Sequence, residues 1–192
     1  MNRPGSPHSE ASSQTGTTMR RLLAATLALL TASPIAAAPK TPPCLLVGDE
    51  TIAGTAPALI GMVGPCAVQA HRGATSTEAL SWPAPGAEFK LVVIGLGAHD
   101  RNMPRLARNL MKMRRALKAE RVFWLRPYDS VPGQVVQLMA ERYSDGLYDL
   151  GRLPTKDGVR PVSFVPVAQT IAGASGRKRP KPKTLSDRQR EW

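Results

Sequence analysis

The sequence predicts an α/β fold in which helices cover both faces of a parallel sheet. The main indication is a series of short apolar runs that end in turn residues, most clearly residues 91–94 before Gly95 and residues 122–125 before Pro127. Such runs are typical of buried strands. Helical patterns lie between the later runs, and strands that alternate with helices favour βαβ units and a parallel sheet.

Strands are predicted at residues 44–47, 66–70, 91–94, 122–125 and 147–150. Between the third and fourth of these, Pro104 suits the first turn of a helix, and one apolar stripe follows at helical spacing: Leu106, Leu110, Met113 and Leu117. A second helix is predicted at residues 134–143, with Val135, Leu138 and Met139 buried, and a third at residues 165–171. Ligand sites in such sheets lie at the carboxyl ends of the strands.

The N-terminal segment is predicted not to belong to the fold. Residues 1–18 are a polar extension that is consistent with a start site placed too far upstream, with Met19 as the working start. Residues 19–38 have the layout of a signal peptide: two arginines, an apolar run at 22–30 and three alanines at 36–38. Polar residues and Pro34 interrupt the run early, which favours a cleaved signal over a membrane anchor. The predicted location is therefore periplasmic or secreted.

The remainder has the size of one domain, and 42% hydrophobic with 21% charged residues is a globular balance. Cys44 and Cys66 are its two cysteines, and export makes a disulfide between them the preferred interpretation. Two buried free thiols are the alternative. A metal site built on this pair of cysteines is disfavoured by their number and spacing.

The chain is strongly basic, with a net charge of +12. Seven basic and two acidic residues lie in the last seventeen positions, and residues 173–192 are rich in charge and proline but poor in apolar side chains. Such a segment cannot bury a core. Residues 173–192 are therefore predicted to form a disordered basic tail.

Polar clusters follow four of the predicted elements, in the order Gly48-Asp49-Glu50, Gly73 to Ser76, Gly97 to Asp100, and Asp157 to Pro161. Their order and spacing resemble the four conserved blocks of the SGNH (GDSL-type) hydrolases. The resemblance covers residues 44–172 and implies a flavodoxin-like three-layer sandwich. It also implies an esterase, lipase, thioesterase or carbohydrate acetylesterase, with a serine, histidine and aspartate acting as a triad.

The resemblance is incomplete at the residues that carry the chemistry. Asp49, Gly73, Asp100 and Asp157 agree with the family pattern, whereas three positions are replaced: Glu50 stands at the serine, His99 at the oxyanion-hole asparagine and Arg160 at the histidine. Arginine cannot act as a general base. A carboxylate at Glu50 opposes formation of an ester oxyanion beside it. The charges of Glu50 and Arg160 are opposite, so an ion pair between them is predicted, with Asp157 near enough to share the guanidinium.

Several other roles are open for the same residues. A rearranged triad would use Ser76 as nucleophile, His99 as base and Asp157 as orienting acid. Glu50 and Asp157 could act as paired carboxylates, as in glycosidases. A metal at Glu50, His99 and Asp157 is chemically possible but not expected. His99 could hold a ligand oxygen with Gly73, or simply be hydrogen-bonded structure.

A cationic stripe is the other candidate surface, formed by Arg101, Arg105, Arg108, Lys112 and Arg115. It could bind an anionic envelope polymer or a lipid surface, although a charged helix face is more often simply solvated. Nucleic acid is not expected, because the chain is predicted to be exported and its tryptophans are not interleaved with the basic run.

The preferred prediction is an exported domain that has lost ester hydrolysis and acts as a binding or accessory module of the cell envelope. The alternative is an active hydrolase with a rearranged site, which would take a small ester or glycan. No cofactor or metal is predicted.

Overall fold

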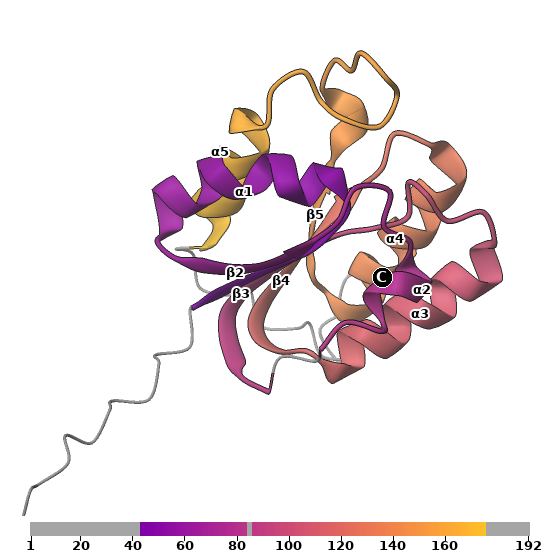
Figure 1. The fold of residues 1–192 in the computed structure, drawn as a ribbon, viewed down its shortest axis with the longest axis horizontal. Helices are drawn as coiled ribbons and strands as arrows, with labels where there is room; N and C mark the ends of the chain where they lie inside the picture. Colours follow the sequence, from indigo (N-terminus) through magenta and orange to yellow (C-terminus); the bar gives the residue numbers. More distant parts are fainter. Residues whose placement is uncertain (1–42, 84–85, 176–192) are drawn as a thin grey trace, which may run out of the picture. The chain divides into compact units, whose positions relative to one another are not determined.

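The computed structural model describes residues 43–83 and 86–175 (Figure 1). The elements follow in the order β1 (Cys44–Gly48), α1 (Glu50–Val63), β2 (Cys66–Ala70), α2 (Ser76–Ala79), β3 (Glu88–Gly95), α3 (Met103–Ala116), β4 (Lys118–Arg126), α4 (Ser130–Tyr143), β5 (Gly146–Asp149), a 3-10 turn (Leu150–Arg152) and α5 (Val165–Ser175). The five strands form one sheet in the order β2-β1-β3-β4-β5, with every neighbouring pair parallel.

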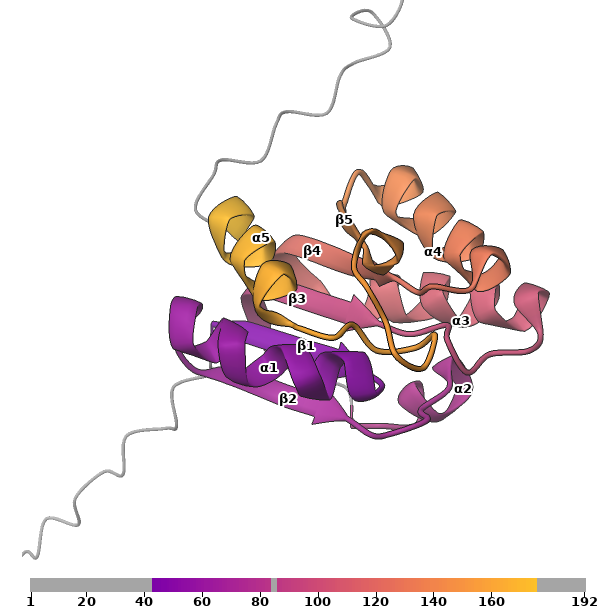
Figure 2. The same cartoon turned by 90° about the horizontal axis from the view of Figure 1, so that it is seen from above.

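Helices cover both faces of this sheet, as Figure 2 shows: α1 and α5 on one side, and α2, α3 and α4 on the other. The strand pleat explains the two cores, because successive side chains point to opposite faces. In β1, Leu45 and Val47 pack in the core under α3 and α4, whereas Leu46 packs with α1 and α5. The predicted three-layer sandwich with a parallel sheet is therefore confirmed.

All five predicted strands are present, and β3 and β4 begin three or four residues earlier than their apolar runs. The apolar stripe of α3 is confirmed, with Leu106, Leu110 and Met113 buried. Helix α4 differs from the prediction, because it begins at Ser130 and exposes Leu138. Val136 is fully buried instead. The Asp129 side chain caps the earlier start by accepting a hydrogen bond from the Val131 backbone N–H.

Helix α1 was not predicted from the sequence, and the reason is local. Its segment contains two glycines and Pro57, which are poor interior helix formers, and its small apolar residues give little periodic contrast. Tertiary packing outweighs these preferences, because Ile52 and Leu59 are fully buried against the sheet and α5. The short helix α2 was missed as well.

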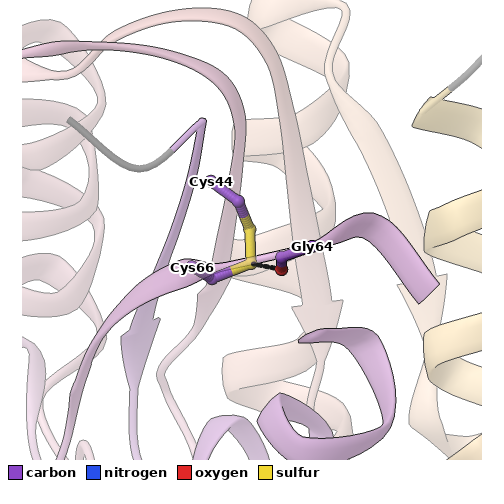
Figure 3. The surroundings of a disulfide bond; sticks show 3 residues. All are labelled: Cys44, Gly64 and Cys66. Carbon is purple, nitrogen blue, oxygen red and sulfur yellow. Dashed lines mark hydrogen bonds between the residues drawn. A yellow bond between two sulfur atoms is a disulfide. The ribbon is translucent and has the colours of Figure 1, made fainter. Parts of the chain in front are cut away.

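Cys44 and Cys66 form a disulfide, as predicted (Figure 3). They occupy paired positions at the first residues of β1 and β2, with their Cα atoms 4.4 Å apart. Since β2 is hydrogen-bonded to β1 alone in the sheet, the bond fastens an edge strand to the centre of the domain.

Three predictions concern segments outside the described residues: the polar extension at 1–18, the signal peptide at 19–38 and the basic tail after residue 175. The predicted boundary at Gly173 is too early, since α5 continues to Ser175. In the described ranges 43–83 and 86–175, no helix has the length and apolar character needed to cross a membrane.

Candidate functional site

The loop after β1 places Glu50 in the first turn of α1. The Asp49 carboxylate caps this helix by accepting hydrogen bonds from the Thr51 backbone N–H at 2.8 Å and from the Thr51 hydroxyl at 2.6 Å. Glycine at position 48 allows β1 and β3 to approach closely before the turn. A Cβ at this position would collide with the carbonyl oxygen of Gly95. Asp49 itself is 1% exposed.

The Glu50 carboxylate is held by groups from two other strand ends. Its Oε2 accepts a hydrogen bond from the backbone N–H of Gly73 at 2.8 Å, and His99 Nε2 lies 3.1 Å from each carboxylate oxygen. Gly73 has φ +74°, a left-handed conformation that favours glycine, and this directs its N–H toward Glu50. The structure therefore brings together three of the sequence-predicted site residues.

Burial and hydrogen bonding act in opposite directions on the two neighbouring acids. Burial raises the pKa of Asp49 to about 6, although both Thr51 hydrogen bonds oppose this and the Glu50 charge adds to it. Burial also raises the pKa of Glu50, but the Gly73 N–H, its own backbone N–H and His99 together outweigh burial and lower it. Glu50 is thus stabilised as a carboxylate, while Asp49 retains its proton more readily.

Arg160 does not face Glu50, so the predicted ion pair is wrong. Its Nε lies 2.6 Å from Oδ2 of Asp157, and no ion pair between Glu50 and Arg160 occurs in the described part of the chain. Asp157 also accepts hydrogen bonds from the backbone N–H groups of Arg160 and Val159. These two hydrogen bonds, together with the Arg160 side chain, hold the pKa of its carboxyl well below the usual range. Asp157 and Arg160 are therefore held together within one local turn, since they are only three positions apart in the sequence.

Ser76 is not placed as a nucleophile beside His99. Its hydroxyl donates to Oδ1 of Asp100 at 2.6 Å and accepts a hydrogen bond from the Asn109 side chain at 3.0 Å. The residue is fully buried. Within residues 43–83 and 86–175, no hydrogen bond joins Ser76 to His99 or His99 to Asp157. The alternative triad is thus not assembled in this structure.

The paired-carboxylate and metal hypotheses that combined Glu50 with Asp157 are not supported by contacts either, since Asp157 bonds within its own turn. A different trio is gathered instead. Asp49, Glu50 and His99 each offer one potential ligand atom, and these atoms lie within 4.8 Å of one another. Asp49 was noted in the sequence only as a match to the family pattern.

The loop that carries Asp157 and Arg160 is anchored on α1 by Phe164. A Cβ on Gly54 would lie 2.2 Å from the Phe164 ring, so this position needs glycine. Beside the loop is a hollow of about 210 Å³ lined by Lys156, Asp157, Arg160, Pro161, Val162 and Phe164. The role of Gly54 was not predicted from the sequence, because a single glycine does not indicate that a distant aromatic ring, here that of Phe164, packs against it.

Solved structures share this arrangement of elements. A carbohydrate acetylesterase from Sinorhizobium meliloti is matched with a TM-score of 0.50 at 13% identity, over 68% of this chain and 96% of that one. The inhibitor-bound aryl esterase of M. smegmatis is matched with a TM-score of 0.51 at 14% identity, over 68% and 98%. The chain has an SGNH-hydrolase-like fold. No protein-family model and no curated protein matches the sequence.

The SGNH-like fold explains why Gly73 and His99 converge on Glu50. Residues 50, 73 and 99 follow β1, β2 and β3, which are neighbours in the sheet, so they meet at one edge. In this chain the carboxylate of residue 50 itself accepts from the Gly73 N–H and contacts His99. The Gly73 N–H is therefore already used by a carboxylate of the protein itself.

Proposed function

We propose that this chain is an exported SGNH-hydrolase-like domain that no longer hydrolyses esters and serves as a binding or accessory module of the cell envelope. The observation that carries the proposal is the Glu50 carboxylate at the Gly73 N–H and His99. An acyl-transfer site needs a nucleophile with an adjacent base and donors that are free for the developing oxyanion. Glu50 uses the donors, and Arg160, bound to Asp157, cannot accept a proton.

The disulfide supports the exported location, because such bonds persist mainly in oxidising compartments. The cationic stripe on α3 supports an anionic binding partner. Its members Arg105, Arg108, Lys112 and Arg115 are all exposed, and none of them forms an ion pair with a described residue. Four unpaired positive charges on one helix face create a field that attracts phosphate-rich or carboxylate-rich surfaces.

An active ester hydrolase is the second candidate, because two of the matched solved structures are a carbohydrate acetylesterase and an aryl esterase. The purified protein should be assayed with a short-chain aryl ester and an acetylated glycan, beside the variants Ser76→Ala and Glu50→Gln. We expect no turnover above the uncatalysed rate for the natural chain. Turnover by the natural chain that either substitution abolishes would overturn the proposal and assign the activity to that residue.

Binding through the stripe is tested with vesicles. The triple variant Arg105→Gln/Arg108→Gln/Lys112→Gln should bind vesicles of phosphatidylglycerol and phosphatidylcholine about tenfold or more weakly than the natural chain, because each surface cation contributes roughly 1 kcal/mol near an anionic membrane. Co-sedimentation at low and physiological salt measures this, and binding should weaken as salt screens the charges.

A matched control for the stripe removes the same charge elsewhere. Lys118, Arg142 and Lys156 are exposed cations outside α3. The variant Lys118→Gln/Arg142→Gln/Lys156→Gln should keep most of the binding. Equal losses in the two triple variants would show that net charge alone attracts the vesicles, and the stripe would then have no particular role.

A further inference from the structure

Two carboxylates and one imidazole meet at the carboxyl ends of β1 and β3, and His99 is the one basic side chain of the described residues that pairs with either acid. Asp49, Glu50 and His99 place one potential ligand atom each within 4.8 Å of the others. Within residues 43–83 and 86–175, no lysine or arginine forms an ion pair with either acid. We propose that these three residues bind a divalent transition-metal ion.

The state of Asp49 points to a ligand. The residue is 1% exposed, and its Oδ1 accepts both hydrogen bonds from Thr51. Its second oxygen, Oδ2, has no hydrogen-bond donor in the described part of the chain. A buried carboxyl group beside a second acid is costly in its charged form, and burial raises the pKa of Asp49 accordingly. A bound cation would supply that missing partner.

The spacing of the potential ligands also suits one ion. Metal–nitrogen and metal–oxygen bonds of roughly 2.0–2.2 Å put two adjacent ligand atoms about 3.0–3.5 Å apart. His99 Nε2 lies 3.1 Å from each oxygen of Glu50, within this range. The widest separation in the trio is at most 4.8 Å, so a tetrahedral ion would draw the ligand atoms together by up to about 1.4 Å.

Neighbouring groups already orient two of the three ligands. The Gly73 N–H holds Oε2 of Glu50, which leaves Oε1 for a metal, and the Thr51 hydrogen bonds fix the Asp49 carboxylate. Outer-shell hydrogen bonds of this kind commonly position metal ligands in proteins. With the ion bound, His99 would carry its proton on Nδ1 and offer the Nε2 lone pair.

The donor set indicates the class of ion. Imidazole suits zinc, copper, iron and nickel, whereas purely carboxylate sites suit magnesium, calcium and manganese. Two carboxylates also balance the charge of a divalent ion when His99 is neutral. Zn²⁺ and Co²⁺ are therefore the probes of choice, because Co²⁺ takes similar ligands and reports its coordination through visible absorption.

The test uses the purified protein without a polyhistidine tag, first stripped with a chelator. Equilibrium dialysis against Zn²⁺, with the metal measured by mass spectrometry, should give one ion per chain. Glu50→Gln and His99→Gln should each weaken binding at least tenfold, and both should lose the visible Co²⁺ spectrum. Circular dichroism confirms that each variant is folded. Glu50 and His99 are half-buried rather than core residues, so both variants should pass this check.

The matched control is His71→Ala. His71 also contacts a glutamate at 3.1 Å, Oε1 of Glu78, but this pair is exposed and has no third ligand. Its removal should leave zinc binding unchanged. The proposal is overturned if the natural chain binds no stoichiometric ion, or if binding survives in Glu50→Gln and His99→Gln alike. Failure of the metal proposal can be told apart from failure of the proposed function, because the ester assay measures turnover and is to be repeated on metal-free and metal-loaded protein.

Discussion

Replacing Arg114 with glutamine should destabilise the domain by about 3 kcal/mol, because the substitution breaks a buried ion pair. Arg114 donates through Nε and a terminal nitrogen to the two oxygens of Asp145, at 2.6 and 2.9 Å. The Asp145 side chain is only 1% exposed, and its Oδ2 also accepts from the indole N–H of Trp124. Without the guanidinium, the buried carboxylate loses a bidentate, charged partner. Urea denaturation followed by circular dichroism measures the loss.

Arg160→Gln is the matched control for this effect. Its Nε is also 2.6 Å from a carboxylate Oδ2, that of Asp157, but 46% of its side chain is exposed. Solvent screens such pairs, so the substitution should change the unfolding free energy little. Equal losses for Arg114→Gln and Arg160→Gln would mean that burial does not decide the strength of these two pairs, contrary to the prediction.

The fold could be predicted from the sequence because two features identify its strands, namely their apolar content and the turn residues that end them. Residues 91–94 show this best, since they lie in the fully covered centre of β3. The segments whose structure was not predicted are those that depend on packing partners far away in the sequence. Helix α1 packs against α5, which lies more than one hundred residues further along the chain. The sequence of α1 alone therefore does not indicate this packing partner.

The candidate site divides in the same way. Strand ends placed Glu50, Gly73 and His99 near one another because parallel strands finish at one edge of a sheet. The predicted contact of Arg160 with Asp157 is present, but the predicted contact with Glu50 is not, because a closed turn already supplies Asp157 three residues away. A short loop closes at a lower entropy cost than a contact across the domain. Local acids should therefore be considered first when a replaced charge needs a partner.

Glu50 has a consequence beyond its own charge. In an SGNH-like site the donors are arranged to receive an oxygen whose negative charge develops during reaction. Under the proposed function that charge is permanent and belongs to Glu50, whose pKa is lowered by the Gly73 N–H and by His99. A polar site can thus keep the donors of a hydrolase while it offers a carboxylate to a cation, which links the proposed loss of hydrolysis to the proposed metal site.

Removing the disulfide with Cys44→Ala/Cys66→Ala should lower the unfolding free energy by about 3 kcal/mol, the loop-closure value for two cysteines 22 residues apart. The bond joins the first residues of β1 and β2, and β2 is an edge strand whose side chains are mostly only partly buried. Little apolar packing is therefore available to replace the covalent link. Urea unfolding measures the total effect, and hydrogen exchange should show the greatest loss of protection in β2.

Reduction of the natural chain provides the control, because it removes the same bond without changing either side chain to alanine. The reduced chain and the double variant should unfold at similar urea concentrations, and the double variant should not respond to the reductant. If the reductant leaves the midpoint of the natural chain unchanged, the bond does not stabilise the domain. If protection is lost evenly over all five strands, then β2 is held by its ladder with β1 and by α1 rather than by the disulfide, and the edge-strand argument is wrong.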